Sequence, residues 1–148
     1  MASDLISVSA TAHSTASAEA VFAALRSGET WPAWSAIKKF ALESPGADGA
    51  EGVGAIRLWN SGLMATREQV VELQAPTKFA YTLLSSKLVA VRDYRADVDV
   101  TPTDTGCTVV WSAVFRPKIP GTGWFWRLAL SKLSASLAKG VAEYAAKA

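Results

Sequence analysis

The C-terminal stretch from Pro120 to Ala148 constrains the fold more than any other part of the chain. Large apolar side chains recur in it every three or four residues, which places them on one face of a single long α-helix. This apolar face consists of Trp126, Leu130, Leu133, Leu137, Val141 and Tyr144. Charged residues such as Arg127, Lys132 and Lys139 fall mostly on the other side. Because the apolar face must be shielded from water, the rest of the chain has to supply a partner for it.

Most of the preceding chain has the pattern of an antiparallel sheet that can cover this helix. Leu5 to His13 alternates small apolar and polar residues, as a strand with one buried side does. The alternation is clearest in Val91 to Thr101 and in Cys107 to Arg116, which a turn at Pro102 to Gly106 joins. Four further strands are expected at Ile37 to Glu43, Gly54 to Trp59, Leu63 to Leu73 and Phe79 to Leu84.

Two short helical elements are expected after the first strand. Ser17 is a suitable N-cap for a helix that ends near Gly28, and Glu19 places a carboxylate in its first turn. Trp31-Pro32-Ala33-Trp34 forms a bend or a second short helix, with both indoles plugging one end of the core. The predicted fold class is α+β, with a curved antiparallel sheet of about six to seven strands against the long C-terminal helix.

Size and composition are typical of a single folded domain that spans residues 1–148. Half of the residues are hydrophobic and 19% are charged, which excludes intrinsic disorder, and six tryptophans indicate a broad apolar interior. The net charge of +2 includes no run of Lys or Arg, so nucleic acid is not expected as a partner. With Cys107 as the only cysteine and no secretory pattern at the start, a cytoplasmic location is expected. No apolar run approaches the ~20 residues that span a bilayer.

Short motifs along nearly the whole chain resemble those of the SRPBCC superfamily. This superfamily includes START lipid-transfer domains, pollen-allergen-like proteins and bacterial polyketide cyclase/dehydrase-like proteins. The resemblance implies a helix-grip fold, in which the sheet wraps around the long helix and a deep, largely apolar cavity lies between them. The motifs, besides the first strand and the last helix, are Ser17-Ala18-Glu19-Ala20-Val21-Phe22, Trp31-Pro32-Ala33-Trp34, Gly52-Val53-Gly54-Ala55-Ile56-Arg57, Thr66-Arg67-Glu68, Phe79-Ala80-Tyr81, Val91-Arg92-Asp93-Tyr94 and Thr108-Val109-Val110-Trp111.

Arg57 and Glu68 are the first candidates for polar groups inside such a cavity. If a two-residue loop at Ser61-Gly62 closes the hairpin, Arg57 is diagonal to Glu68 on one face and the two charges can pair inside. A three-residue loop breaks this arrangement. The alternatives are a structural buried pair or an exposed pair, and the sequence leaves all of them open.

Aromatic residues and one more arginine complete the predicted ligand-binding set. Tyr94 faces inward by strand parity, and Arg92 shares that parity. A tyrosine that faces a hollow offers an apolar ring and one hydroxyl donor, although ordinary core packing remains the alternative. The full predicted set is Arg57, Trp59, Glu68, Tyr81, Arg92, Tyr94, Trp111, Trp126, Leu130, Leu133 and Leu137.

Other chemistry-bearing residues give weaker signals. His13 stands at a strand end and is expected to face solvent rather than to act in catalysis. Cys107 follows a turn and is expected to be an unreactive, buried or half-buried thiol. No His or Cys pair has metal-ligand spacing, and Gly52 with Gly54 forms no phosphate cradle, so we expect neither a metal nor a cofactor.

The start of the long helix carries Trp124, Phe125 and Trp126 beside Arg127. These aromatics suggest transient contact with a membrane interface at most, and the alternative is that at least one indole closes the core. The loops Ser44 to Gly52 and Ser85 to Val91 are candidate gates of the cavity.

Three functions follow from these predictions. The first is binding of a hydrophobic small molecule, a lipid, sterol-like, aromatic or polyketide-like compound, in the cavity. The second is an enzyme of the polyketide cyclase/dehydrase type, in which polar cavity residues polarise a substrate. The third is a filled core that acts only through protein contacts. The sequence does not define the oligomeric state.

Overall fold

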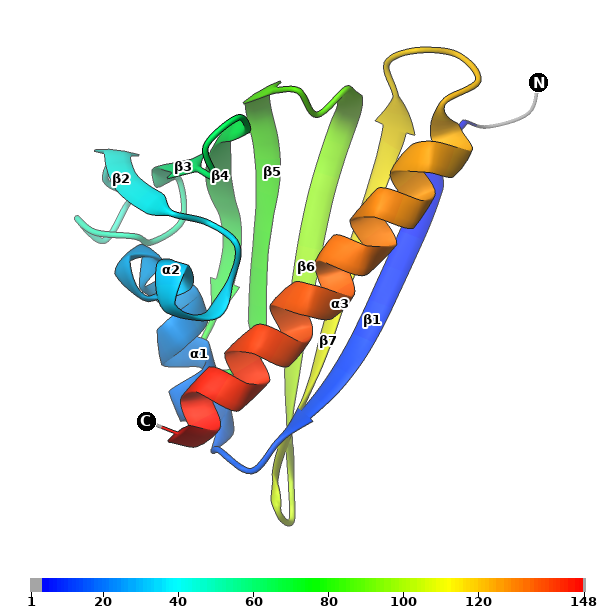
Figure 1. The fold of residues 1–148 in the computed structure, drawn as a ribbon. Coiled ribbons are helices and arrows are strands. Elements are labelled where there is room, and N and C mark those ends of the chain that lie inside the picture. Colours follow the sequence, from blue (N-terminus) through cyan, green and yellow to red (C-terminus); the bar gives the residue numbers. More distant parts are fainter. Residues whose placement is uncertain (1–3, 148) are drawn as a thin grey trace.

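The computed structural model describes residues 4–147, which form one seven-stranded sheet with helices on its concave side (Figure 1). The strands pair antiparallel in the order β1-β7-β6-β5-β4-β3-β2, and α3 crosses the sheet diagonally. The predicted helix-grip fold is therefore confirmed. In chain order the elements are β1 (Ile6–Ser14), α1 (Ala18–Arg26), a 3-10 turn (Gly28–Thr30), α2 (Trp31–Trp34), β2 (Lys39–Ser44), β3 (Ile56–Asn60), β4 (Ala65–Gln74), β5 (Lys78–Lys87), β6 (Val91–Thr103), β7 (Gly106–Pro117) and α3 (Gly123–Lys147).

The two short helices form as their capping and proline signals predict. The Oγ atom of Ser17 accepts a hydrogen bond of 3.1 Å from the backbone N–H of Ala20 and so caps α1. Pro32 lies in the first turn of α2, where its missing N–H group leaves no helical bond unmade. The indoles of Trp31 and Trp34 are buried, with their ring centroids 4.6 Å apart. Together they close one end of the core.

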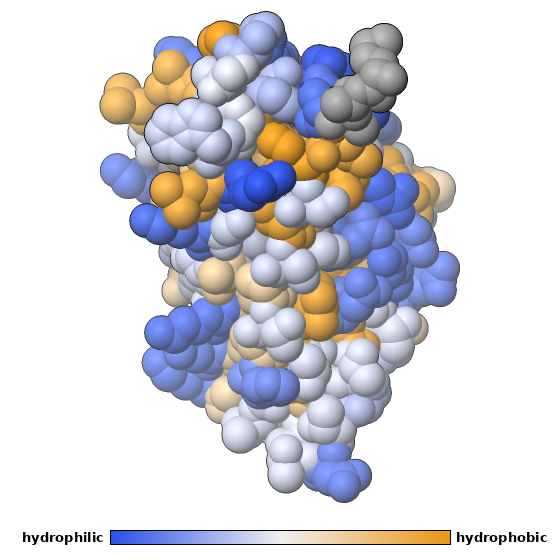
Figure 2. Space-filling view, turned by 90° about the vertical axis from the view of Figure 1, so that its right-hand side faces the viewer, coloured by the Kyte–Doolittle hydropathy of each residue, from blue (hydrophilic) through white to orange (hydrophobic). Residues whose placement is uncertain are grey.

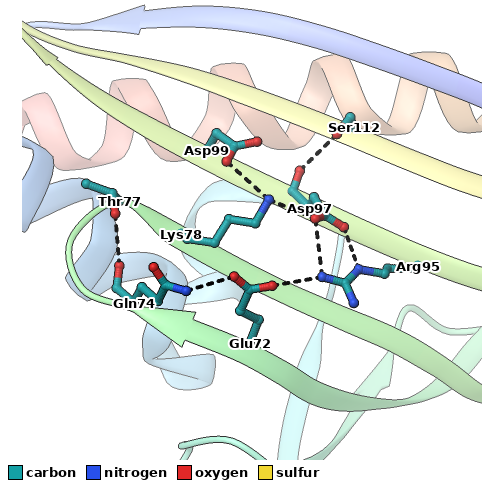
Figure 3. Close-up of polar contacts among 8 residues, drawn as sticks. All are labelled: Glu72, Gln74, Thr77, Lys78, Arg95, Asp97, Asp99 and Ser112. Atoms are coloured by element: carbon teal, nitrogen blue, oxygen red, sulfur yellow. Dashed lines mark hydrogen bonds and ion pairs between the residues drawn. The ribbon is translucent and has the colours of Figure 1, made fainter.

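The two sides of β6 and β7 differ as their alternation predicts. Val98 of β6 pairs with Trp111 of β7, and Val100 pairs with Val109, with all four side chains buried beneath α3 and α1. The outer face of the sheet is polar instead, and Figure 3 shows the ion pairs that cross it.

This outer network joins three strands. The Nζ atom of Lys78 lies 2.8 Å from the carboxylate of Asp97 and 3.2 Å from that of Asp99. Arg95 pairs with Asp97 at 2.8 Å and with Glu72 at 3.0 Å. Asp97 and Asp99 thus face away from the helix, as predicted, and their charges are compensated on the solvent side.

A bulge near the start of β6 interrupts the alternation. The pairing with β7 shifts between Arg92 and Arg95, and the intervening Asp93 has a φ of 54°. The guanidinium of Arg92 lies in solvent, where it pairs with Asp4 at 2.9 Å, whereas Tyr94 is buried. The prediction that Arg92 shares the inward side of Tyr94 is therefore wrong, because the extra residue breaks the period of two.

The loop that closes the β3–β4 hairpin is longer than the two-residue loop considered from the sequence. Arg57 lies directly opposite Glu68, and four residues, 61–64, connect the strands. The Asn60 Oδ1 atom accepts a hydrogen bond of 2.9 Å from the backbone N–H of Gly62 and stabilises the turn. Because the loop is longer by an even number of residues, Arg57 and Glu68 still share the inner face of the sheet.

Small residues make up more of the buried face of helix α3 than the spacing of its large apolar residues predicts. Leu133 is 42% exposed, whereas Ala138 and Ala142 are at most 2% exposed. The approach to α2 is so close that a Cβ atom on Gly140 would lie 2.1 Å from the carbonyl oxygen of Trp34. The true buried face is therefore rotated from the predicted one, because alanine and glycine carry little hydrophobic signal. It consists of Leu130, Ser134, Leu137, Ala138, Val141, Ala142 and Ala145. Within residues 4–147, no helix is long and apolar enough to cross a membrane.

Candidate functional site

A cavity of about 410 Å³ lies between the inner face of the sheet and the first half of α3. Its walls come from β3 to β6, from the loops at one end of these strands, and from the loop after α2. Side chains of the described residues do not fill this space, which favours the two alternatives that need a cavity over a filled core. The lining residues are Trp31, Ser35, Ala36, Ile37, Trp59, Ser61, Met64, Thr66, Glu68, Tyr81, Val89, Tyr94, Trp126, Ala129, Leu130, Lys132, Leu133 and Leu137.

Aromatic rings form the deep end of the cavity. Trp59 stacks on Trp31 with ring centroids 4.6 Å apart, and the rings of Tyr81 and Tyr94 lie 6.5 Å apart. Burial raises the pKa of both tyrosines above its usual value, so both hydroxyls stay protonated. The deep end therefore offers broad apolar faces together with two hydroxyl donors.

Glu68 brings a carboxyl group from β4 into this apolar space. Its Oε1 atom accepts a hydrogen bond of 2.8 Å from the indole N–H of Trp59. Removal from bulk water raises the pKa of Glu68 to about 7, although the Arg57 charge and the Trp59 hydrogen bond oppose the rise. Near neutral pH the group exists in both protonation states, so it can accept a proton or donate one.

Arg57 is fully buried but does not line the cavity. Its Nη1 atom donates to the Glu51 carboxylate and to the Leu25 carbonyl, both at 3.2 Å. Burial lowers the pKa of Arg57, and the charges of Glu68 and Glu51 oppose that change. Its guanidinium carbon lies 4.8 to 5.1 Å from three aromatic ring centroids, those of Trp31, Trp59 and Phe79. Arg57 thus supports the aromatic wall from behind its rings and acts on Glu68 through its charge.

The structure brings most of the predicted site residues together around the cavity, with three exceptions. Arg57 lies behind the wall, Arg92 lies on the surface, and Trp111 is buried in the core. The Trp111 ring packs edge-on against Trp31, with centroids 5.7 Å apart, so its core alternative applies. Whether the cavity-lining residues contact a ligand stays a prediction. These residues are Trp59, Glu68, Tyr81, Tyr94, Trp126, Leu130, Leu133 and Leu137.

Several lining residues were not predicted from the sequence. Thr66 shares the inner face of β4 with Glu68, so strand parity could have identified it. Met64 and Val89 come from loops, whose conformation no periodic pattern defines. Lys132 was placed on the water side of α3, and it is exposed as expected, but it also borders the cavity mouth.

The remaining candidates lie away from the cavity. His13 is exposed, with its Nδ1 atom 3.1 Å from the Thr108 hydroxyl. Burial raises the pKa of the Cys107 thiol, which lowers its reactivity. Among the described residues, no group of three or more His, Cys, Asp or Glu side chains could hold a metal ion. Of the two candidate gates, Ser44 to Gly52 contributes nothing to the cavity lining, whereas Ser85 to Val91 contributes Val89.

A second depression, of about 560 Å³, lies across β2 to β5 and is widely open to solvent. Its charged side chains, those of Lys39, Arg67 and Lys87, are all cations. The cavity beneath α3 is less open to solvent and alone of the two contains a carboxyl with a strongly raised pKa, so it is the better candidate for a small-molecule site.

Comparisons with known proteins agree with this geometry. Residues 6–148 match the profile of a family described as polyketide cyclase / dehydrase and lipid transport. No curated protein sequence gives a significant match. Similar solved structures include a START superfamily protein from Mycobacterium smegmatis, with a TM-score of 0.77 and 16% identity over 95% of this chain and 97% of that one.

Two further structures share the fold. A protein from Thermobifida fusca has a TM-score of 0.75 and 23% identity over 95% of this chain and 93% of that one. Norcoclaurine synthase from Thalictrum flavum has a TM-score of 0.75 and 15% identity over 99% of this chain and 98% of that one. At such low identities the likeness establishes the fold alone.

Proposed function

Since the chain belongs to the polyketide cyclase / dehydrase and lipid transport family, we propose that it binds one hydrophobic small molecule between the sheet and α3. The observation that carries this proposal is the mostly apolar cavity of about 410 Å³. Its volume falls in the range of small-molecule sites, roughly 300 to 1,000 Å³. Filling such a hollow with an apolar molecule restores the dispersion contacts that its walls lack.

The polar groups at the deep end narrow the chemistry of the ligand. The Glu68 carboxyl, which already accepts a hydrogen bond from Trp59, and the hydroxyls of Tyr81 and Tyr94 are largely removed from bulk water, and each can take a further hydrogen-bond partner. A ligand with a carbonyl or hydroxyl group at one end would supply those partners. A lipid, sterol-like, aromatic or polyketide-like compound with such a group fits both the apolar walls and the polar end.

Titration with N-phenyl-1-naphthylamine, a neutral apolar dye that fluoresces when shielded from water, tests this proposal. Ala129 lines the cavity on α3, so Ala129→Phe should fill part of it and weaken binding about tenfold or more. Ala135 lies on the exposed side of the same helix, and Ala135→Phe is the matched control that should bind like the wild type. Equal affinity of the wild type and Ala129→Phe, or no saturable binding, would contradict the proposal.

A second candidate function is catalysis on such a ligand, and Glu68 is the observation that favours it. A carboxyl with a pKa of about 7 suits proton transfer at neutral pH. The proposed reaction is removal of a proton from carbon next to a ligand carbonyl by Glu68, while a tyrosine hydroxyl donates a hydrogen bond to the carbonyl oxygen.

Variants separate catalysis from carriage. Glu68→Gln and Tyr94→Phe keep the shape of the cavity while they remove the carboxylate and one hydroxyl. If both bind a polyketide mimic like the wild type but no longer convert it, catalysis is supported. If they lose affinity and the wild type shows no turnover, carriage is supported.

A further inference from the structure

Exposed apolar side chains gather at one end of the molecule, where α3 begins. Of the thirteen large hydrophobic side chains that are exposed among residues 4–147, seven belong to the β3–β4, β5–β6 and β7–α3 loops and the start of α3 at this end. Figure 2 shows apolar side chains concentrated in the upper half of one face, with charged ones among them. We name this set the apolar end. It consists of Leu63, Met64, Leu88, Ile119, Trp124, Phe125 and Leu128.

Backbone pairing holds these segments side by side. Ala65 at the start of β4 pairs with Lys87 at the end of β5. The backbone N–H of Lys118, just after β7, donates a hydrogen bond of 2.9 Å to the carbonyl of Ala90 in the β5–β6 loop. The segments that carry the apolar end are therefore neighbours, and a group of exposed apolar side chains on neighbouring segments indicates an interaction site.

Two of these residues are large and apolar although they contribute little to the folded core. Trp124 is 71% exposed, so its large ring contributes little to the core. Leu88 is 61% exposed and has a φ of 75°, in the left-handed region that favours glycine or asparagine. An apolar side chain in that conformation at a loop tip is unfavourable in water, which indicates that Leu88 has a role other than stabilising the fold.

The charges around the apolar end have one sign. Lys87, Lys118, Arg127 and Lys132 are all exposed, and the segments 60–66, 84–90 and 117–142 contain no Asp or Glu. The acidic residues near the adjoining strand ends, Asp4 and Asp93, are engaged by Arg92 and Arg116. Tryptophan and phenylalanine flanked by unopposed cations are the residues that enter the headgroup region of an anionic bilayer.

The mouth of the cavity lies within the same surface. Met64 belongs to both the apolar end and the cavity lining, and Val89, Lys132 and Leu133 border the mouth beside it. A molecule that leaves the cavity between these residues emerges at the apolar end.

We propose that the apolar end docks on the surface of an anionic membrane. Trp124, Phe125 and Leu88 enter the headgroup region, and Lys118 and Arg127 contact the lipid phosphates. The cavity mouth then faces the bilayer, so an apolar ligand passes between the two without crossing water. Docking itself depends only on the surface residues and goes beyond the proposed function.

Flotation of the full chain with vesicles tests this docking. The wild type should float with vesicles that contain phosphatidylglycerol, and it should float poorly with phosphatidylcholine alone or in high salt. The double variant Trp124→Ser/Phe125→Ser should lose about tenfold or more of its affinity for the anionic vesicles. Lys118→Gln and Arg127→Gln should each weaken binding about fivefold.

Two control variants make the result specific. Val53→Ser removes an exposed apolar side chain in the β2–β3 loop and should float like the wild type. Ala129→Phe fills part of the cavity but leaves the apolar end intact, so it should also float. This variant distinguishes a failure of docking from a failure of ligand binding. The proposal is overturned if the wild type does not bind anionic vesicles or if Trp124→Ser/Phe125→Ser floats equally well. It is also overturned if the apolar end instead joins two copies of the chain, seen as a dimer that Trp124→Ser/Phe125→Ser dissociates.

Discussion

Replacing Glu68 with glutamine should remove a pH dependence of stability that this one carboxyl creates. Its pKa of about 7 in the folded chain lies above the ordinary value of 4.5. The folded state therefore holds the proton more tightly than the unfolded state, so its stabilising effect is complete below pH 4.5 and is lost as the pH rises to 7. At about 1.4 kcal/mol per pH unit, the wild type loses up to about 3 kcal/mol across this window.

Glutamine is neutral at every pH, and its side-chain oxygen can still accept the hydrogen bond from Trp59. The free energy of unfolding of Glu68→Gln should therefore rise relative to the wild type, by up to about 3 kcal/mol, between pH 4.5 and pH 8. Urea unfolding followed by circular dichroism at several pH values measures this difference. Glu143→Gln, at an exposed position of α3, should keep the wild-type pH dependence. Parallel curves for the wild type and Glu68→Gln would refute the reasoning.

Three further substitutions test the charge near Glu68, the packing of α3 against α2 and the N-terminal cap of α1. Arg57→Met should raise the pKa of Glu68 further, because the guanidinium charge lowers it, and a carbon-13 NMR titration of the carboxyl would show an unchanged midpoint if the reasoning is wrong. Gly140→Ala should lower the free energy of unfolding by about 1 to 3 kcal/mol despite the better helix propensity of alanine, because its Cβ atom meets the Trp34 carbonyl. A gain in thermal stability would contradict that close approach. Ser17→Ala should reduce stability by about 1 kcal/mol, whereas Ser17→Asp should preserve the cap and the stability.

Hydrophobic periodicity was sufficient to predict the layers of the fold. In β6 the buried residues are apolar and most of the residues that alternate with them are polar, as with Val98 and Asp97, so the buried side was evident. Arg92 was misplaced because a bulge depends on the register between strands, which no single strand reveals. The buried face of α3 was misplaced by a small rotation because Ala138 and Ala142, rather than large residues, lie at its centre.

The site was harder to predict than the fold. Tyr94 could be assigned to the inner face, since strand parity decides that directly. The inner position of Glu68 depended on the length of the β3–β4 loop, which the sequence left open. Whether Arg57 lines the cavity or lies behind its wall depends on how aromatic rings from three elements pack around it. The loop residues Met64 and Val89 were missed because their position depends on the length of the hairpin and on contacts between loops.

The central claim, that the cavity holds a hydrophobic molecule, is tested most directly by native mass spectrometry of gently purified protein. The wild type should carry one noncovalently bound small molecule that denaturation releases, and Ala129→Phe from the same host should carry none. The released compound should be apolar, with a carbonyl or hydroxyl group to meet Glu68, Tyr81 and Tyr94. A wild type with the mass of the bare chain, or an equal load on both proteins, would contradict the account.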